Sequence, residues 1–168
     1  PELKILEVGC GTGQLIKEIT EQYPKVHYLG IDVAENMVEI AAKDNTGENV
    51  TFRHCPVEDF ESEEKYDVIL CTHAFPYFPE KDKVMKKMAG LCRKDGRVII
   101  ANSSTNSLKD LIINFGLKAT TSKAKYLSIE EMKKLFEGAG LQPKEVSIIR
   151  ERFYMPTIAL FHSQLRND

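Results

Sequence analysis

Three glycines at alternating positions, Gly9, Gly11 and Gly13, follow a short apolar run and precede a stretch with helical spacing. At such a strand-to-helix turn, an open parallel sheet forms its ligand crevice. Glycine lets the backbone turn tightly and approach a ligand where a Cβ atom would collide with it. The segment therefore indicates a small-molecule site. The alternative is a tight turn without a ligand.

A carboxylate, Asp32, ends the next strand-like run. In that position it could accept hydrogen bonds from both hydroxyls of a ribose, and the alternative is a cap on the following helix. A dinucleotide fingerprint has glycine at the sixth position of the motif, where this chain has Gln14. A ligand without a pyrophosphate is therefore favoured over a nicotinamide dinucleotide.

The loop after the fourth apolar run, residues 72–78, contains one imidazole and three aromatic rings. His73 is the candidate catalytic base, because imidazole can take up a proton at neutral pH. A polar loop residue, or one that touches only a cofactor, is the alternative. The aromatic rings could line an apolar pocket or face a cation, and ordinary loop packing explains them equally well.

Short apolar runs alternate with helical stretches, which is typical of strand–helix–strand units around a parallel sheet. The pattern predicts five parallel strands, at Leu3–Val8, Val26–Ile31, Val50–His54, Tyr66–Thr72 and Arg97–Ala101. The predicted helices lie between Leu15 and Tyr23, at Glu35–Lys43, at Val84–Cys92 before a Lys94–Gly96 turn, and near Leu108–Phe115.

The last part of the chain begins with a capping box, in which Ser128 and Glu131 open a helix that runs through Ala139. Two final strands are predicted, at Val146–Ile149 and Tyr154–Phe161. Because Pro156 lacks an N–H group, it is expected near the start of the last strand or at an unpaired position.

The chain resembles the class I S-adenosylmethionine-dependent methyltransferases, and among them the broad group of small-molecule and general methyltransferases. The resemblance begins at Leu3 and covers nearly the whole chain. It rests on the segments Leu6–Gly13, Gly30–Asp32, Met37, Tyr66–Ile69 and Leu91–Ile100. The resemblance implies an α/β, Rossmann-like fold: a seven-stranded, mostly parallel sheet with helices on both faces, whose last strand inserts antiparallel beside strand five.

The same resemblance implies S-adenosyl-L-methionine as the cofactor and S-adenosyl-L-homocysteine as the product. Gly9 and Gly11 would line the methionine part, and Glu7 would organise the loop. Asp32 would hold the ribose, and Val33 or Met37 would contact the adenine. Plain core packing is the alternative for Met37. The remaining expected cofactor-binding residues are Cys10, Gly13, Val57, Glu58 and Thr72.

One segment departs from the family pattern. Many relatives have Gly-Asp-Ala after strand three, with the aspartate on the adenine amino group, but the matching residues here are Cys55-Pro56-Val57. The Val57 N–H could still reach an adenine ring nitrogen, and Glu58 or Asp59 could supply the missing acceptor. A solvated acidic loop is the alternative for these two carboxylates.

Length and composition limit the partners. A chain of 168 residues, 42% of them hydrophobic, suits a single domain spanning residues 1–168. The net charge of -2 gives no positive field for a polyanion, so a nucleic-acid partner is disfavoured. The apolar runs are all far shorter than the ~18 residues that span a bilayer, so we expect a cytoplasmic protein with no membrane partner. The four cysteines lack paired spacing, which argues against both a metal site and disulfides.

The sequence therefore predicts a methyltransferase that acts on an oxygen or nitrogen of a small molecule, less often of a protein side chain. Two alternatives stay open: a nicotinamide-dependent oxidoreductase, and a cofactor-binding scaffold without catalysis.

Overall fold

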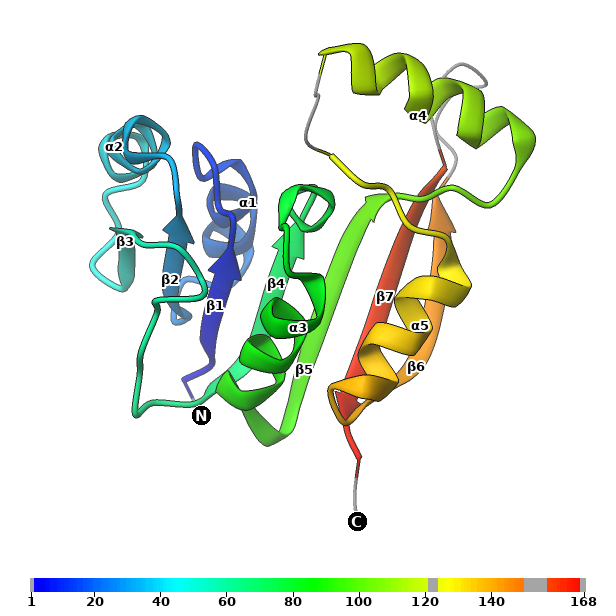
Figure 1. Cartoon of the computed structure of the whole chain (residues 1–168). Helices are drawn as coiled ribbons and strands as arrows, with labels where there is room; N and C mark the ends of the chain where they lie inside the picture. Colours follow the sequence, from blue (N-terminus) through cyan, green and yellow to red (C-terminus); the bar gives the residue numbers. More distant parts are fainter. Residues whose placement is uncertain (1, 121–123, 150–156, 167–168) are drawn as a thin grey trace.

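The computed structural model describes residues 2–120, 124–149 and 157–166. Its sheet has the strand order β3-β2-β1-β4-β5-β7-β6 (Figure 1). The strands are β1 Lys4–Val8, β2 His27–Asp32, β3 Val50–His54, β4 Tyr66–Thr72, β5 Cys92–Ser103, β6 Leu141–Ile149 and β7 Ile158–Leu165. The helices are α1 Gln14–Gln22, α2 Glu35–Asp44, α3 Lys81–Leu91, α4 Leu108–Thr120 and α5 Ile129–Gly138, with a 3-10 turn, η1, at Phe75–Tyr77.

The sheet is seven-stranded and mostly parallel, as predicted. Strands β1 to β5 pair in parallel. The last strand, β7, lies antiparallel between β5 and β6. This order places the carboxyl ends of β1, β2 and β4 at one edge of the sheet. The strand order reverses between β1 and β4, because the chain crosses from β3 back to β4 on the other side of β1. In open α/β sheets, that edge is where ligands bind.

Apolar side chains form a core on each face of the sheet. The larger cluster lies under α3 and α5, and in it Phe136 of α5 contacts Phe161 of β7 at a centroid distance of 5.5 Å. The smaller cluster lies under α1, where Ile16 and Tyr28 are buried. Helices therefore cover both faces, as expected for a parallel sheet.

The predicted capping box begins α5. The Ser128 hydroxyl accepts a hydrogen bond from the Glu131 N–H at 3.2 Å, and the Glu131 carboxylate accepts one from the Ser128 N–H at 2.8 Å. Both residues satisfy N–H groups that the first helical turn leaves without partners. The local pattern alone was enough to predict this helix start.

Several predicted boundaries differ from the structure. The predicted Lys94–Gly96 turn lies inside β5, because the strand bulges between its Cys92 and Arg97 pairings with β4. Strand β6 starts at Leu141 rather than Val146, since Gly140, at φ 74°, turns the chain directly from α5 into the sheet. Strand β7 continues to Leu165. The predicted first residues of the last strand, including Tyr154 and Pro156, lie outside the described residues.

Candidate active site

The glycine loop, residues 9–13, joins the carboxyl end of β1 to α1. The Gly9 and Cys10 N–H groups both donate to the Ile31 carbonyl, at 2.8 and 3.1 Å, which fixes the loop to the end of β2. Gly9, Gly11 and Gly13 have φ angles of 77°, 53° and 75°. Residues with a Cβ atom rarely adopt such angles, so the backbone itself requires glycine at the alternating positions.

The three glycines differ in what surrounds them. A Cβ atom on Gly9 would collide with the side chain of Ala74, so this glycine lets the loop after β4 come close. On Gly13 it would lie 2.8 Å from the Asn45 amide of the α2 C-cap. On Gly11 it would meet no atom within 4 Å. Gly11 therefore faces open space, whereas Gly13, expected to bind the cofactor, packs against the protein and lines neither of the two cavities described below.

Asp32 lies at the carboxyl end of β2 and braces the glycine loop. Its Oδ2 atom accepts a hydrogen bond from the Gly11 N–H at 2.8 Å, and its Oδ1 atom accepts one from the Ala34 N–H at 2.9 Å. The second bond closes a turn ahead of α2, whose N-cap residue is Ala34 and makes no side-chain cap hydrogen bond, so Asp32 does not cap the helix. Each carboxylate oxygen can accept a further bond, and Asp32 lines the larger cavity. Asp32 can therefore brace the loop and bind a ligand at the same time.

Glu7 is a buried carboxyl group under the glycine loop, with an exposed fraction of 1%. Its two oxygens accept hydrogen bonds from the Tyr28 hydroxyl and, at 3.1 Å, from the Thr72 hydroxyl. Burial raises the pKa of Glu7 to about 7, although the two hydroxyl donors lower it. The Glu7 carboxyl group is therefore poised to gain or lose a proton near neutral pH, and it ties β1, β2 and β4 together.

The larger cavity, of about 630 Å³, opens on one side of the glycine loop. Its walls include Val33, which precedes α2, Met37 on the first turn of that helix, and the buried Val57. Among the described residues, the Val57 N–H has no hydrogen-bond acceptor, so a ligand atom could take that place. Glu58 lines the cavity but Asp59 does not, which makes Glu58 the available carboxylate of the pair. Apolar walls beside a few polar groups suit a nucleoside base.

A second cavity, of about 440 Å³, opens on the other side of the loop and is lined by polar groups, including Glu7, Cys10 and Glu18. Burial, with the nearby Glu7 and Asp32 charges, raises the pKa of the Cys10 thiol to about 12, so the thiol is neutral. The two cavities have four lining residues in common: Gly9, Gly11, Thr72 and His73. The loop therefore separates an apolar compartment from a polar one.

His73 lies where the two cavities meet, as its sequence position suggested. Its φ angle of 59° is the one positive value at a non-glycine residue among the described residues. Its N–H donates to the Ala101 carbonyl at 2.7 Å, which fixes the loop to the end of β5. A non-glycine residue held in this conformation costs on the order of 1–3 kcal/mol, and such strain clusters at functional sites. The backbone thus presents the imidazole at the cavity.

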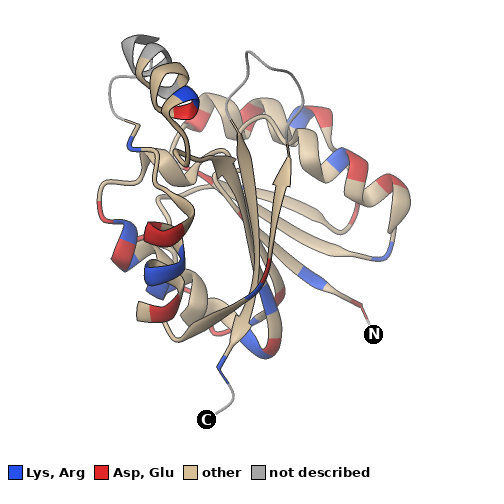
Figure 2. Cartoon of the chain, turned by 90° about the vertical axis from the view of Figure 1, so that its right-hand side faces the viewer, with Lys and Arg blue, Asp and Glu red and all other residues tan. Residues whose placement is uncertain are grey.

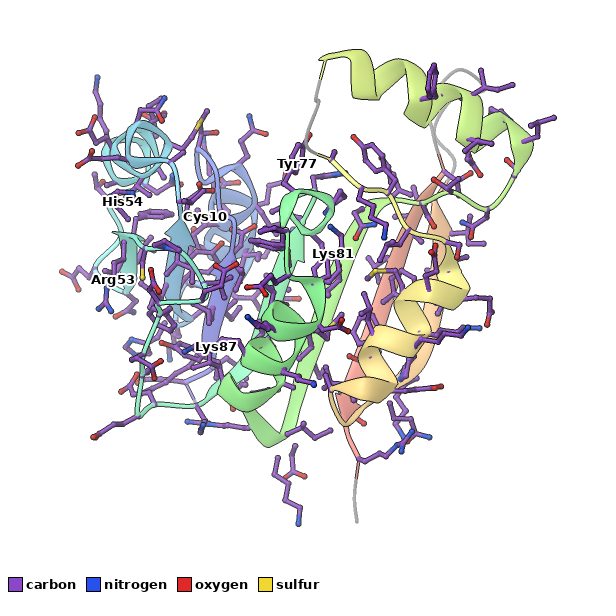
Figure 3. All side chains as sticks on the ribbon, in the orientation of Figure 1. Cys10, Arg53, His54, Tyr77, Lys81 and Lys87 are labelled. Carbon is purple, nitrogen blue, oxygen red and sulfur yellow. The ribbon has the colours of Figure 1, made fainter. Side chains whose placement is uncertain are left out.

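The aromatic loop after His73 contributes Tyr77 and Phe78 to the larger cavity. Lys81, on the first turn of α3, donates to the Pro76 carbonyl at 2.9 Å and to the Phe78 carbonyl at 2.7 Å (Figure 3). Burial, with the nearby positive charge of Lys125, lowers the pKa of Lys81. Sequence analysis missed this lysine because its two partners are backbone carbonyl groups. Every residue has such a group, so the residue types do not reveal the contact.

The other histidines line neither cavity, whereas Cys55 lines the larger cavity and Cys10 lines the second one. The His54 ring is within 3.0 Å of the Val33 carbonyl, and His162 contacts Arg97 on the neighbouring strand. The four cysteines are free, and three of them are buried. Within the described ranges, no group of three or more His, Cys, Asp or Glu side chains could hold a metal ion. No helix in those ranges is long and apolar enough to cross a membrane.

Comparison with known proteins gives a family match over most of the chain. Residues 1–152 match the family model described as a methyltransferase domain. Malonyl-[acyl-carrier protein] O-methyltransferase of Bacillus cereus is 32% identical over 114 residues, which cover 67% of this chain and 42% of that protein. Ubiquinone biosynthesis O-methyltransferase of Acinetobacter baumannii is 28% identical over 157 residues, or 86% of this chain and 65% of that protein.

Solved structures show the same fold. Magnesium protoporphyrin IX methyltransferase from Synechocystis, crystallised with bound S-adenosylhomocysteine, superposes with a TM-score of 0.79 at 19% identity, over 99% of this chain and 75% of that one. The chain therefore has a methyltransferase domain architecture, although it spans only 42% to 65% of the length of the two curated relatives above.

Proposed function

Because this chain belongs to the class I S-adenosylmethionine-dependent methyltransferase family, we propose that it transfers a methyl group from S-adenosylmethionine to an oxygen or nitrogen atom of a small molecule. The observation that carries this proposal is the pair of cavities that meet at Gly9, Gly11, Thr72 and His73. An apolar compartment beside a polar one matches a cofactor that has a nucleoside at one end and an amino acid at the other.

The residues of the two cavities fit this cofactor. In the larger cavity, the adenine would lie against Val33, Met37 and Val57, where the Val57 N–H and the Glu58 carboxylate can meet its polar edge. Asp32 would accept hydrogen bonds from the ribose hydroxyls. The methionine part would pass Gly11, which faces open space, and enter the polar cavity. There Glu7 offers a carboxylate to its ammonium group.

When bound, S-adenosylmethionine supplies a methyl group that is already activated on a sulfonium. The protein then has to align an acceptor and exclude water, and alignment alone can provide ~7 to 11 kcal/mol of the barrier. The aromatic residues Tyr77 and Phe78 would shield the acceptor side of the larger cavity. His73, at the junction of the cavities, would take the proton that the acceptor loses, as a general base.

An oxygen acceptor is favoured over a nitrogen acceptor by the two curated relatives, both of which are described as O-methyltransferases. The acceptors differ between these relatives, one being a malonyl group on a carrier protein and the other belonging to ubiquinone biosynthesis. We extend only the shared oxygen chemistry to this chain. A phenol or another weakly acidic hydroxyl group would suit a base such as His73.

A titration with cofactors tests this proposal and separates its alternatives. We expect S-adenosylhomocysteine to raise the melting temperature by mass action, and NAD to leave it unchanged, because Gln14 occupies the place of the third dinucleotide glycine. A shift with NAD alone would favour the oxidoreductase. A shift with S-adenosylhomocysteine, followed by no methyl transfer to any of a panel of hydroxyl and amine acceptors, would favour the scaffold.

A further inference from the structure

Helix α4 exposes an apolar face to solvent. Four large apolar side chains, which we call the α4 face, repeat at the spacing of one side of a helix, and each is between 53% and 75% exposed: Leu108, Leu111, Ile112 and Phe115. Helices of this length are normally held by packing such a face against the rest of the protein. Figure 1 instead shows α4 beyond the carboxyl end of β5, apart from the helices that cover the sheet.

The helix is held to the domain from its other side. Asp110, which lies opposite the α4 face, is buried, with an exposed fraction of 2%. Its Oδ1 atom accepts a hydrogen bond from the Thr157 N–H at 3.0 Å, and its Oδ2 atom accepts one from the Ser107 hydroxyl at 2.8 Å. These bonds attach the start of α4 to the segment that leads into β7, and they leave the α4 face pointing away from the domain.

The charge of this region differs from that of the rest of the chain. Residues 104–127 contain four lysines, at 109, 118, 123 and 125, and a single acid, Asp110, whose carboxylate is buried. The whole chain has a net charge of -2. Lys109 and Lys125 are exposed. On the other helices and loops, acidic and basic residues are interspersed (Figure 2). Among the described residues, the exposed apolar face thus has the exposed Lys109 beside it, in a segment that contains more lysines than acids while the whole chain is acidic.

We propose that the α4 face docks on an anionic lipid surface, with the helix lying in the plane of the interface. An apolar helix face combined with flanking lysines is the pattern of helices that lie at the headgroup boundary, where lysine is attracted to anionic lipids. A second copy of the chain fits less well, because symmetric pairing of the α4 face would bring two lysine-rich segments together. The proposal does not depend on the proposed enzymatic function.

This inference differs from the expectation of no membrane partner, which rested on the lack of a spanning apolar run. A peripheral contact needs no such run, since the 13-residue α4 would lie on the surface and not cross it. The face is at the same sheet edge as the candidate active site (Figure 1). Docking would therefore bring the acceptor side of the site to the lipid.

Vesicle flotation with the full chain tests the proposal. Wild-type protein is expected to float with phosphatidylglycerol vesicles, to bind phosphatidylcholine vesicles at least about tenfold more weakly, and to lose binding as salt is raised. Ile112→Glu should weaken binding to the anionic vesicles by about tenfold or more. Ile40→Glu is the matched control, because Ile40 is an exposed isoleucine of another helix, α2. It should bind like the wild type.

Three results would overturn the proposal. One is a wild-type protein that does not float with the anionic vesicles. Another is equal flotation of the Ile112→Glu and Ile40→Glu variants. The third comes from size-exclusion chromatography without lipid: a wild-type dimer that Ile112→Glu converts to a monomer would show that a second copy covers the α4 face. Unchanged melting temperatures of both variants would confirm that the comparison concerns folded protein.

Discussion

Replacing Gly11 with alanine tests whether the glycine loop binds a ligand or is only a turn. Gly11 has a φ angle of 53°, and an added Cβ atom would meet nothing within 4 Å. The protein also offers a matched control in Gly140, which has a φ angle of 74° and equally open surroundings, in the turn between α5 and β6. Forcing alanine into this backbone region costs roughly 1–2 kcal/mol at either position. Both variants should therefore lose a similar few degrees of melting temperature.

The two variants should differ in cofactor affinity. Gly11 lines both cavities, so its added methyl group would enter the space that the methionine part needs, whereas Gly140 lines neither. Calorimetric titration with S-adenosylhomocysteine should show a dissociation constant raised by about tenfold or more in Gly11→Ala, which corresponds to ~1.4 kcal/mol, and unchanged in Gly140→Ala. Normal affinity in a folded Gly11→Ala protein would refute the reasoning and leave the loop as a turn only.

Four other changes test the remaining parts of the site. Asp32→Ala should weaken S-adenosylhomocysteine by ~10- to 100-fold in calorimetry, with Asp32→Asn between it and the wild type; unchanged affinity would leave Asp32 as a brace alone. Because the folded-state pKa of Glu7 is raised from 4.5 to about 7, the stability that protonated Glu7 contributes is present below pH 4.5 and is lost as pH rises toward 7. Denaturant unfolding should therefore show the wild type losing stability relative to Glu7→Gln over that window, by on the order of 3 kcal/mol, and a constant difference would contradict the burial argument. His73→Ala should lower turnover ~100-fold while cofactor affinity stays nearly unchanged, and a matching loss of affinity would recast His73 as a binding residue. Lys81→Met should cost about 1–3 kcal/mol of stability by removing two hydrogen bonds from a charged donor, and Lys81→Arg should recover part of it; equal unfolding midpoints for wild type and Lys81→Met would exclude this role.

The features that sequence predicted have local causes. The capping box depends on only two residues, Ser128 and Glu131, which are three positions apart, and the structure contains both of its hydrogen bonds. The strand positions follow from apolar runs, since buried parallel strands need them on both faces. The glycine loop could be predicted because a positive φ angle leaves few residue types to choose from.

The features that sequence could not predict depend on distant parts of the chain. Gly9 and Gly13 look alike in the motif, but their roles are set by Ala74 and Asn45, which only the fold brings near. The strained φ angle of His73 depends on its bond to Ala101, on another strand. The double role of Asp32 became visible only when both of its carboxylate oxygens were found on backbone N–H groups.

A crystal structure of the protein with S-adenosylhomocysteine tests the central claim most directly. We predict that the adenine lies against Val33, Met37 and Val57, that both ribose hydroxyls are within hydrogen-bond distance of Asp32, and that the homocysteine part passes Gly11 toward Glu7. A ligand bound outside these two cavities, or a ribose turned away from Asp32, would contradict the account.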